Sequence, residues 1–224
     1  ATTLAAAVRT AAASVVATQA LARRDARTLA IVGTGEEARA HLEAFQAVRP
    51  FERVIVWGRD AAKAAALAAR ARSLGTAQVE VAPSVREAAA HADVLCTVTS
   101  APTPLLSGDD LRPGMHLCLV GSSIPQTREV DEEVVARARY YVDYRESAMA
   151  QAGELLHAIR AGRVTDAHVL GEIGEVLAGR VAGRRSDEEI TVYKSLGVAA
   201  QDLAAAALVY RRALERQAGT VARL

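Results

Sequence analysis

Short apolar runs alternate with stretches of helical spacing along most of the chain. After an Ala-rich stretch over residues 3–24 that predicts a helix, apolar runs predict strands at 28–32, 53–57, 78–81, 93–97, 115–120 and 140–142. Helical spacing is also found over 36–48 and 61–73, where Asp60 is the expected N-cap, and a short helix is expected after Ser84. This alternation predicts an α/β fold, a doubly wound parallel sheet of at least six strands joined by right-handed crossovers.

Two further helical stretches follow the last predicted strand, over 146–180 and 195–216. Since they come after the predicted sheet is complete, we expect them to cap it or to extend into another lobe. The chain begins at Ala1 without a methionine and passes directly into the Ala-rich stretch. We therefore expect that an upstream segment is missing from the sequence.

A glycine-rich pattern of the form GxGxxA separates the first predicted strand from the next helix, with the residues Gly33, Thr34, Gly35, Glu36, Glu37 and Ala38. In dinucleotide-binding proteins the first glycine permits a tight turn and the second lets a pyrophosphate approach the backbone. The small sixth residue allows close helix packing, and the helix N-terminus supplies N–H donors. Bare structural turns share this pattern, but the second strand and helix that follow favour cofactor binding.

The end of the second predicted strand indicates which cofactor is preferred. Enzymes that select NAD usually place an acidic residue there, about 20 residues beyond the glycine pattern, to bind the ribose 2′-OH. Here the strand ends in Trp57-Gly58-Arg59-Asp60, where an arginine suits a 2′-phosphate. The alternative is that Arg59 is a solvated loop charge and Asp60 only caps the next helix. We expect NADP(H) to be preferred, with NAD(H) possible.

Small and hydroxylated residues follow the fourth and fifth predicted strands, over 97–102 and 120–125. Ligands of open α/β sheets bind beyond the carboxyl ends of the strands, so these residues are expected to line the nicotinamide end of the site. Ser, Thr and Pro are also ordinary loop formers, and both interpretations stand on these residues alone.

Composition excludes several classes of protein. Hydrophobic residues make up 51% and aromatic residues 4%, which suits helices packed on a parallel sheet with small aliphatic side chains. The formal charge is +1 and no basic stripe is present, so nucleic acid is not an expected partner. We expect that no apolar run approaches the roughly 18 to 20 residues that cross a bilayer, and that the protein is soluble and cytoplasmic with no membrane partner. Cys96 and Cys118 lack metal-ligand spacing, so we expect inert core residues and no metal site.

A series of short motifs extends along nearly all of the chain. They are Arg9-Thr10-Ala11-Ala12-Ala13-Ser14 with Thr18, Gly33-Thr34-Gly35 with His41, Ala92-Asp93-Val94 leading to 97–100, 111–114, Gly121 with Pro125 and Glu129, Gly153-Glu154, Gly171-Glu172 and 190–197. In this order they resemble the ornithine cyclodeaminase and mu-crystallin family. The resemblance implies a Rossmann-type dinucleotide-binding domain over 25–194. It assigns 1–24 and 195–224 to a substrate and dimerisation lobe whose upstream part is absent.

The resemblance also implies roles for individual residues. The arginine that opens the first motif binds the substrate carboxylate in this family, so Arg9 is expected to do so here; a guanidinium fork matches a carboxylate. Without the family match, a solvated helix charge would be the preferred interpretation of Arg9. Ser195 belongs to a segment that closes around the nicotinamide ribose, or serves as the N-cap of the next helix, or both. The expected cofactor-binding residues are Thr10, Gly33, Thr34, Gly35, Glu36, Glu37, Ala38, Gly58, Arg59, Thr97, Thr99, Ser100, Val120, Gly121, Lys194, Ser195 and Gly197.

One position departs from the cyclodeaminase pattern. Cyclodeaminases of this family carry an aspartate for proton transfer after the fifth strand, whereas this chain has Ser123. Serine is no unassisted general base near neutral pH, so the resemblance is closer to the mu-crystallin type, whose members reduce cyclic ketimines. We predict an NAD(P)H-dependent reductase of a cyclic ketimine or imino acid, or the reverse amino-acid dehydrogenase, with Arg9 and Ser123 as its catalytic residues.

Two alternatives stay open. One is a deaminating lyase of the ornithine cyclodeaminase type, in which bound NAD is reduced and reoxidised within one turnover. The other is a non-catalytic, NADP-dependent ligand-binding protein. Net consumption of NADPH separates these from a reductase. For all three, the resemblance implies a homodimer and a small amino or imino acid that carries a carboxylate.

Overall fold

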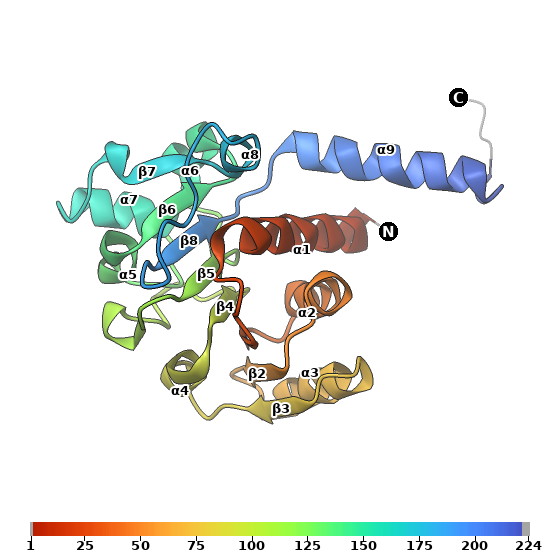
Figure 1. Ribbon diagram of the computed structural model, residues 1–224, viewed down its shortest axis with the longest axis horizontal. Coiled ribbons are helices and arrows are strands. Elements are labelled where there is room, and N and C mark those ends of the chain that lie inside the picture. The colour runs from red at the N-terminus through yellow and green to blue at the C-terminus, as the bar shows by residue number, and fades with distance from the viewer. Residues whose placement is uncertain (1, 221–224) are drawn as a thin grey trace.

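The computed structural model describes residues 2–220 and contains an eight-stranded sheet (Figure 1). Neighbouring strands all pair in parallel, in the order β3-β2-β1-β4-β5-β8-β6-β7. The predicted α/β fold is therefore confirmed, including the parallel pairing of the first two strands. The strands are β1 (Thr28–Val32), β2 (Arg53–Trp57), β3 (Gln78–Val81), β4 (Val94–Thr97), β5 (His116–Leu119), β6 (Arg139–Val142), β7 (Val169–Glu172) and β8 (Thr191–Lys194).

Local capping explains where several helices begin. Asp60 accepts hydrogen bonds from the N–H groups of Ala62 and Lys63, so the expected N-cap is confirmed, and so is the short helix expected after Ser84, whose side chain accepts from the Glu87 N–H. The ranges predicted from spacing, 36–48 and 61–73, match two helices at both ends. The α-helices are α1 (Thr2–Leu21), α2 (Glu36–Val48), α3 (Ala61–Ser73), α4 (Val85–His91), α5 (Glu132–Arg137), α6 (Arg145–Gln151), α7 (Gly153–Arg160), α8 (Ile173–Leu177) and α9 (Ala199–Glu215), with 3-10 turns η1 (Gly108–Asp110) and η2 (Asp166–His168).

The C-terminal part of the sheet differs from the prediction. Residues 146–180 are not only helical, because β7 lies within them, and β8 inserts between β5 and β6. The expectation that the sheet is complete by residue 142 is therefore wrong. β7 is a four-residue edge strand that contains Gly171 and exposes Leu170, so it lacks the continuous apolar run that marks a buried strand.

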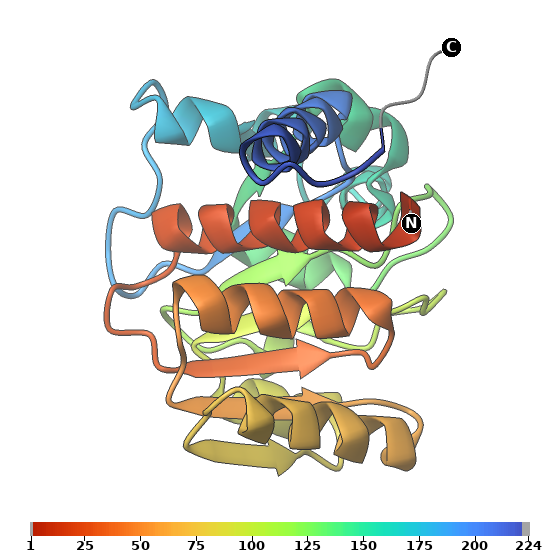
Figure 2. The same cartoon turned by 90° about the vertical axis from the view of Figure 1, so that its right-hand side faces the viewer.

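Alternating side chains along the strands build one apolar layer on each face of the sheet. Ile31 and Val56 pack on the face covered by α1, α2 and α3, whereas Ile55 and Leu95 pack on the face covered by α4, α5 and α7. Figure 2 shows α1 and α2 side by side across the first face, with α3 continuing the layer. Because helices cover both faces, a ligand reaches the sheet at the carboxyl ends of its strands.

The first and last helices lie side by side but differ in their packing. Helix α1 packs on α2 and β8, whereas α9 extends away from the sheet beside α1 (Figure 1). Helix α9 begins at Ala199 with Val198 as its N-cap, so the expectation that Ser195 caps it is wrong. Instead, Ser195 continues β8 and donates its N–H to the Leu119 carbonyl. The assignment of 1–24 and 195–224 to a second lobe stays a prediction.

Helix α1 contains a stretch that is apolar enough to cross a membrane by length and composition alone. It is Leu4–Leu21, with a mean hydropathy of 1.4, so the expectation that no such run exists is wrong. The many alanines and valines raise the mean hydropathy, and Arg9 is the single charged residue of the stretch. Within the fold 44% of the stretch is buried, and a core helix passes the same test, so this is weak evidence for a membrane span.

Candidate cofactor and substrate site

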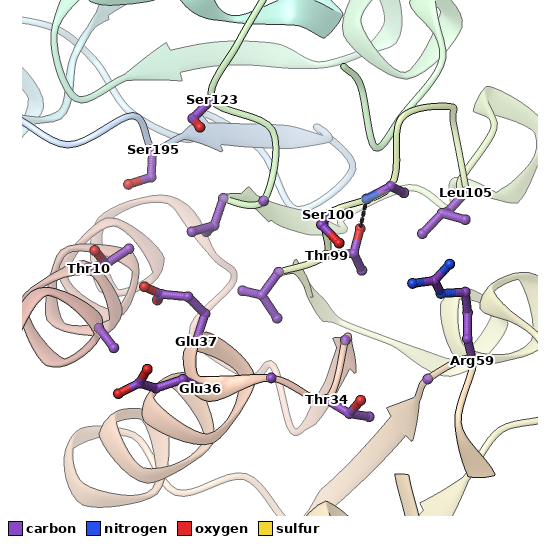
Figure 3. Close-up of a pocket in the computed structure, with 18 of the residues that line it drawn as sticks. Thr10, Thr34, Glu36, Glu37, Arg59, Thr99, Ser100, Leu105, Ser123 and Ser195 are labelled. Atoms are coloured by element: carbon purple, nitrogen blue, oxygen red, sulfur yellow. Dashed lines mark hydrogen bonds between the residues drawn. The ribbon is translucent and has the colours of Figure 1, made fainter. Parts of the chain in front are cut away.

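A cavity of about 1090 Å³ lies at the carboxyl ends of β1, β2, β4 and β5, bounded by α1 and the turn after β8. It exceeds the roughly 300–1,000 Å³ of typical small-molecule sites. Figure 3 shows Thr10, Glu37, Thr99 and Ser123 disposed around it. The expected site residues that line the cavity are Arg9, Thr10, Gly33, Thr34, Gly35, Glu36, Glu37, Gly58, Arg59, Thr99, Ser100, Val120, Gly121, Ser123, Ser195 and Gly197.

Three expected cofactor-binding residues do not line the cavity. Ala38 is fully buried in the core behind the glycine turn, as its expected packing role requires. Thr97 is also fully buried, and its hydroxyl donates to Glu129. Lys194 is fully buried and pairs with Glu154 at 3.1 Å, so its ammonium has no access to a ligand in the cavity.

The glycine turn has the geometry that a diphosphate needs. Gly33 has φ +131°, and a Cβ there would lie 2.7 Å from the Val98 carbonyl oxygen, so only glycine fits this crossing. A Cβ at Gly35 would meet no atom within 4 Å, which means that the open side of this residue faces free space. Gly35 is the N-cap of α2 and, as a glycine, offers no side chain to the first N–H groups of the helix. These donors suit an anion.

Two carboxylates stand beside those donors. Glu36 and Glu37 form the first turn of α2 and line the cavity. Burial raises the pKa of Glu37, while the Arg9 charge lowers it and Glu36 raises it further. Glu37 and the Arg9 guanidinium are therefore close enough to interact at this end of the cavity.

The end of β2 brings two cations and one carboxylate to the cavity. Arg59, Asp60 and Lys63 all line it, but the Asp60 carboxylate is engaged as the cap of α3, where it accepts from two backbone N–H groups at 2.9 and 3.0 Å. Figure 3 shows the Arg59 side chain extending from the β2 end along the side of the cavity where Leu105 lies. Sequence reasoning missed Lys63; its position in the first turn of α3, directly after the strand end, was the available signal.

Arg9 is a partly buried guanidinium held by the last helix. Its Nε donates to Asp202 Oδ1 at 2.9 Å and its Nη1 to Gln201 Oε1 at 3.2 Å, and its side chain is 19% exposed. The φ of Gly197 is +85°, and a Cβ there would lie 2.9 Å from Nη1, so the backbone packs directly on the guanidinium. This geometry differs from that of a solvated helix charge. Within residues 2–220, Nη2 donates no hydrogen bond and remains for a ligand.

Two serines lie at the same end of the cavity. Ser123, on the loop after β5, is exposed, and Ser195, after β8, is 2% exposed. The Ser195 hydroxyl oxygen is buried and has no hydrogen-bond partner within the part of the chain that the structure describes. Figure 3 shows both serines on the side of the cavity opposite Thr34. A buried, unsatisfied hydroxyl beside a cavity suits a polar ligand group.

A buried histidine ties α1 to α2 behind the cavity. His41 Nδ1 lies 2.7 Å from the Glu37 carbonyl oxygen and Nε2 lies 2.9 Å from Ser14 Oγ. Since a carbonyl only accepts, Nδ1 carries the proton and Nε2 accepts from the serine hydroxyl. Burial lowers the pKa of His41, which favours this neutral form. The expected burial of Cys96 and Cys118 is also confirmed.

Together, the parallel sheet, the glycine turn at the first strand and the cavity beyond the strand ends define a Rossmann-type fold. The family model of the ornithine cyclodeaminase/mu-crystallin family matches residues 1–217. The chain belongs to this family.

Individual relatives are similar over almost the whole chain. The Δ1-pyrroline-2-carboxylate reductase of Bacillus cereus is 39% identical over 213 residues, which are 95% of this chain and 65% of that protein. The chain thus spans slightly less than two thirds of the length of this relative. The structure of the Thermococcus litoralis Δ1-pyrroline-2-carboxylate reductase in complex with NADH and L-proline has a TM-score of 0.93 and 35% identity, covering 97% of this chain and 68% of that one. An archaeal alanine dehydrogenase dimer with bound NAD has a TM-score of 0.91 and 32% identity, covering 97% of this chain and 67% of that one.

Proposed function

We propose that this chain carries the cofactor-binding part of an NAD(P)H-dependent oxidoreductase that reduces the C=N bond of a cyclic ketimine or imino acid, or catalyses the reverse oxidation. The observation that carries the proposal is the position of Arg9. Its guanidinium borders the same cavity as the glycine turn and the N-terminus of α2. One cavity thus offers a site for a diphosphate and a cation for a carboxylate. The named activity of the Bacillus and Thermococcus relatives supports this assignment.

The residues of the chain bind and orient the reactants. When bound, a reduced nicotinamide supplies a hydride to the imine carbon, and a proton reaches the nitrogen to give the amine. Arg9 binds the carboxylate attached to that carbon and fixes its distance from the cofactor side of the cavity. Such orientation is a large part of the rate in hydride transfer, because it replaces a bimolecular encounter. Asp202 and Gln201 hold the guanidinium in place.

Ser123 favours the reductase over the cyclodeaminase. By the resemblance of the surrounding motif, it takes the place of the proton-transferring aspartate of cyclodeaminases, and a serine hydroxyl is no general base near neutral pH. We assign it the role of a wall or hydrogen-bond donor beside the substrate nitrogen. A deaminating lyase would need a base elsewhere.

We further propose that NADP(H) is preferred over NAD(H). Arg59 and Lys63 line the cavity at the β2 end, where a 2′-phosphate would lie, and Asp60 is engaged as a helix cap. A guanidinium binds phosphate bidentately, and an ammonium adds a second positive charge. The Thermococcus reductase structure contains NADH and the archaeal alanine dehydrogenase structure contains NAD. We therefore expect this chain to bind NAD(H) as well, with lower affinity than NADP(H).

We also propose that the protein is a cytoplasmic homodimer that uses the outer face of α9. Leu203, Tyr210 and Leu214, which share one face of α9 by their spacing, are 62% to 72% exposed. Apolar side chains of this size are rarely left together in water, and the archaeal alanine dehydrogenase that this chain resembles is a dimer. A second copy of the chain is the expected occupant. Sedimentation analysis of the full-length protein should give a dimer; a stable monomer would contradict this.

One assay separates the candidate functions. The full-length protein is incubated with NADPH or NADH and either Δ1-pyrroline-2-carboxylate, Δ1-piperideine-2-carboxylate, or pyruvate with ammonia, and cofactor absorbance is followed. We expect net consumption with at least one cyclic imino acid. Release of ammonia and formation of proline from ornithine, without net change of the cofactor, would establish the lyase instead. Cofactor and imino acid binding without turnover would support the non-catalytic binding protein.

A further inference from the structure

A buried carboxylate joins the ends of β4 and β5. These two strand ends border one half of the cavity, which we call the inner half. Glu129, on the segment between β5 and α5, is 0% exposed. Its Oε1 accepts from the Thr99 N–H and the Thr99 hydroxyl, both at 2.7 Å. Its Oε2 accepts from the Thr97 hydroxyl at 2.7 Å and from the Gly121 N–H at 2.8 Å. One side chain therefore binds the end of β4 and the end of β5 at once.

The same residue also holds a third wall of the cavity. Its backbone carbonyl accepts from the Leu105 N–H at 2.8 Å, and Leu105 lines the cavity. Between the strand ends, the contact is so close that a Cβ at Gly121 would lie 2.0 Å from the Thr99 carbonyl oxygen and 2.5 Å from Glu129 Oε1. No larger residue fits between these two walls, and the carboxylate accepts a backbone hydrogen bond from each of them.

A buried cation lies on the other side of the β5 end. Lys194 Nζ donates to the carbonyl oxygen of Ser122 and to Glu154 Oε1. The loop after β5 is thereby held at Gly121 by Glu129 and at the next residue by Lys194, directly before the cavity-lining Ser123. Ionic hydrogen bonds of this kind are short and strong when they are buried.

We propose that Glu129 is a positioning residue that fixes the β4 and β5 ends, and with them the walls of the nicotinamide half of the cavity. The inference rests on the proposed function to the extent that it takes the inner half of the cavity as the nicotinamide site. Glu129 has no part in the glycine turn or the β2 end. It therefore governs how the inner half binds, while the diphosphate and adenosine half is independent of it.

The four donors explain why a carboxylate, and not an amide of the same size, occupies this position. Hydroxyl groups can turn to suit a partner, but the N–H groups of Thr99 and Gly121 are fixed in the backbone. They approach opposite oxygens of Glu129. In Glu129→Gln, whichever way the amide is oriented, its NH₂ group faces one of these two N–H donors. One wall is thus released while side-chain volume stays the same.

The test compares ligands with and without the nicotinamide. Dissociation constants of NADH and ADP-ribose, and of NADPH and 2′-phospho-ADP-ribose, are measured by calorimetry with the full-length protein and with Glu129→Gln. In the unsubstituted protein we expect the dinucleotides to bind more tightly. In Glu129→Gln this advantage should fall about tenfold, the scale of one charge-assisted hydrogen bond, while affinity for the ADP-ribose ligands stays within about twofold.

A neighbouring carboxylate provides the matched control. Asp131 accepts from the backbone N–H groups of Gly108 and Val134 and does not line the cavity. Asp131→Asn should lower the melting temperature without changing the ratio of the two dissociation constants. If Glu129→Gln does not fold, Thr97→Val removes one of the four donors and should reduce the same ratio by a smaller factor.

The outcomes separate this inference from the proposed function. An unchanged ratio in a folded Glu129→Gln protein, or equal losses for both kinds of ligand, would overturn the positioning role even if imine reduction is found. Equal affinities of the unsubstituted protein for dinucleotide and ADP-ribose would remove its premise. If the unsubstituted protein binds no dinucleotide at all, the proposed function itself fails.

Discussion

The two halves of the cavity are built in different ways. The half at β1 and β2, called the backbone half below, is formed mainly by main-chain groups: a glycine turn and the N–H groups at the start of α2. The cations Arg59 and Lys63 follow directly after its second strand. The half at β4, β5 and β8 depends on side chains that come from distant positions. Arg9 is held by a residue 193 positions away, and Glu129 binds a threonine 30 positions away.

The two halves therefore suit different parts of the ligands: the first suits the diphosphate, which all dinucleotides share, and the second suits the nicotinamide ring and a particular substrate. A diphosphate is satisfied by backbone donors that any suitable turn can supply. Orientation of a ring and a small carboxylate needs groups fixed in three dimensions, because errors of about 1 Å cost much of the rate. Substitutions in the first half should therefore change affinity for the diphosphate and adenosine part of the cofactor. Those in the second half should change turnover and the affinity that the nicotinamide adds.

The largest effect is expected from Arg9→Ala. Loss of the guanidinium leaves the substrate carboxylate unpaired in a partly desolvated site. Transition-state stabilisation should fall by about 3 kcal/mol or more, which lowers kcat/KM at least a hundredfold. Cofactor affinity should stay within about twofold. Steady-state kinetics with a cyclic imino acid and calorimetry with NADPH measure the two quantities.

Two further variants sharpen this result. Arg9→Lys keeps the charge but loses the fork and should give an intermediate rate. Arg24, which is exposed beyond the other end of α1, provides the control, and Arg24→Ala should retain full activity. A loss of less than tenfold in Arg9→Ala, or an equal loss of cofactor affinity, would remove Arg9 from its assigned role.

Gly35→Ala should act only on the backbone half. The φ of Gly35 is −84° and no atom lies within 4 Å of a Cβ there, so the melting temperature should change little. The added methyl group would occupy the space of the diphosphate, and overlap of this kind costs about 1–3 kcal/mol, or about tenfold to hundredfold in the dissociation constant of NADPH. Gly174→Ala, which also meets no atom within 4 Å, is the control. Unchanged NADPH affinity in Gly35→Ala would contradict the assigned diphosphate position.

Arg59→Ala should narrow the preference for NADPH over NADH. The expected loss is about 1–3 kcal/mol in NADPH affinity, the scale of a charge-assisted hydrogen bond, with NADH affinity unchanged as an internal control. Lys63→Ala should act in the same direction with a smaller effect, because an ammonium makes no bidentate contact. Equal affinity of the unsubstituted protein for the two cofactors would refute the NADP(H) preference.

Ser123→Ala should have a modest effect. Loss of a hydrogen-bond donor or cavity wall should cost about 1 kcal/mol of transition-state stabilisation, which lowers kcat/KM about fivefold. Loss of a residue essential to proton transfer would lower it roughly 10²-fold to 10⁴-fold. The same kinetic assay decides between these values. A loss beyond a hundredfold would make Ser123 part of the proton-transfer chemistry and weaken the argument against the lyase.

The smallest effect concerns the histidine that joins α1 to α2. Burial lowers the pKa of His41 below its usual 6.5, so in the acid range the unfolded chain binds a proton that the folded chain does not. Stability should therefore rise with pH through the region below 6.5 and be lost as pH falls, by less than about 1.4 kcal/mol per pH unit, the limit for one proton. Denaturant unfolding at several pH values measures this slope. His41→Gln should flatten it, and replacement of the exposed His91 should not; an unchanged slope in His41→Gln would exclude this cause.

The backbone half of the cavity was well predicted from the sequence, because the sequence patterns that specify it are local. The strand before Gly33, the turn and the helix after it lie within one stretch of about 20 residues, and both the pattern and the caps are governed by neighbours in sequence. The fold class followed from the same periodicity. β7 was missed because an exposed edge strand of four residues carries no apolar run.

The side-chain half was predicted only in part, since its partners are distant in sequence. Arg9 was assigned by family resemblance, but the hold of Asp202 on it crosses nearly the whole chain. Glu129 stood out as a motif residue without a role, because the four donors that surround it come together only in the folded sheet. Lys194 was expected at the ligand, and the fold buries it against Glu154 instead.

The most direct test of the proposed reduction follows the hydride itself. The full-length protein is given Δ1-pyrroline-2-carboxylate and NADPH carrying deuterium at both C4 positions of the nicotinamide, and the product is examined by mass spectrometry and NMR. We expect proline with one deuterium at Cα and one equivalent of NADP⁺. Proline without deuterium at Cα, or no proline together with deuterium retained in the cofactor, would contradict direct transfer from the cofactor to an imine carbon.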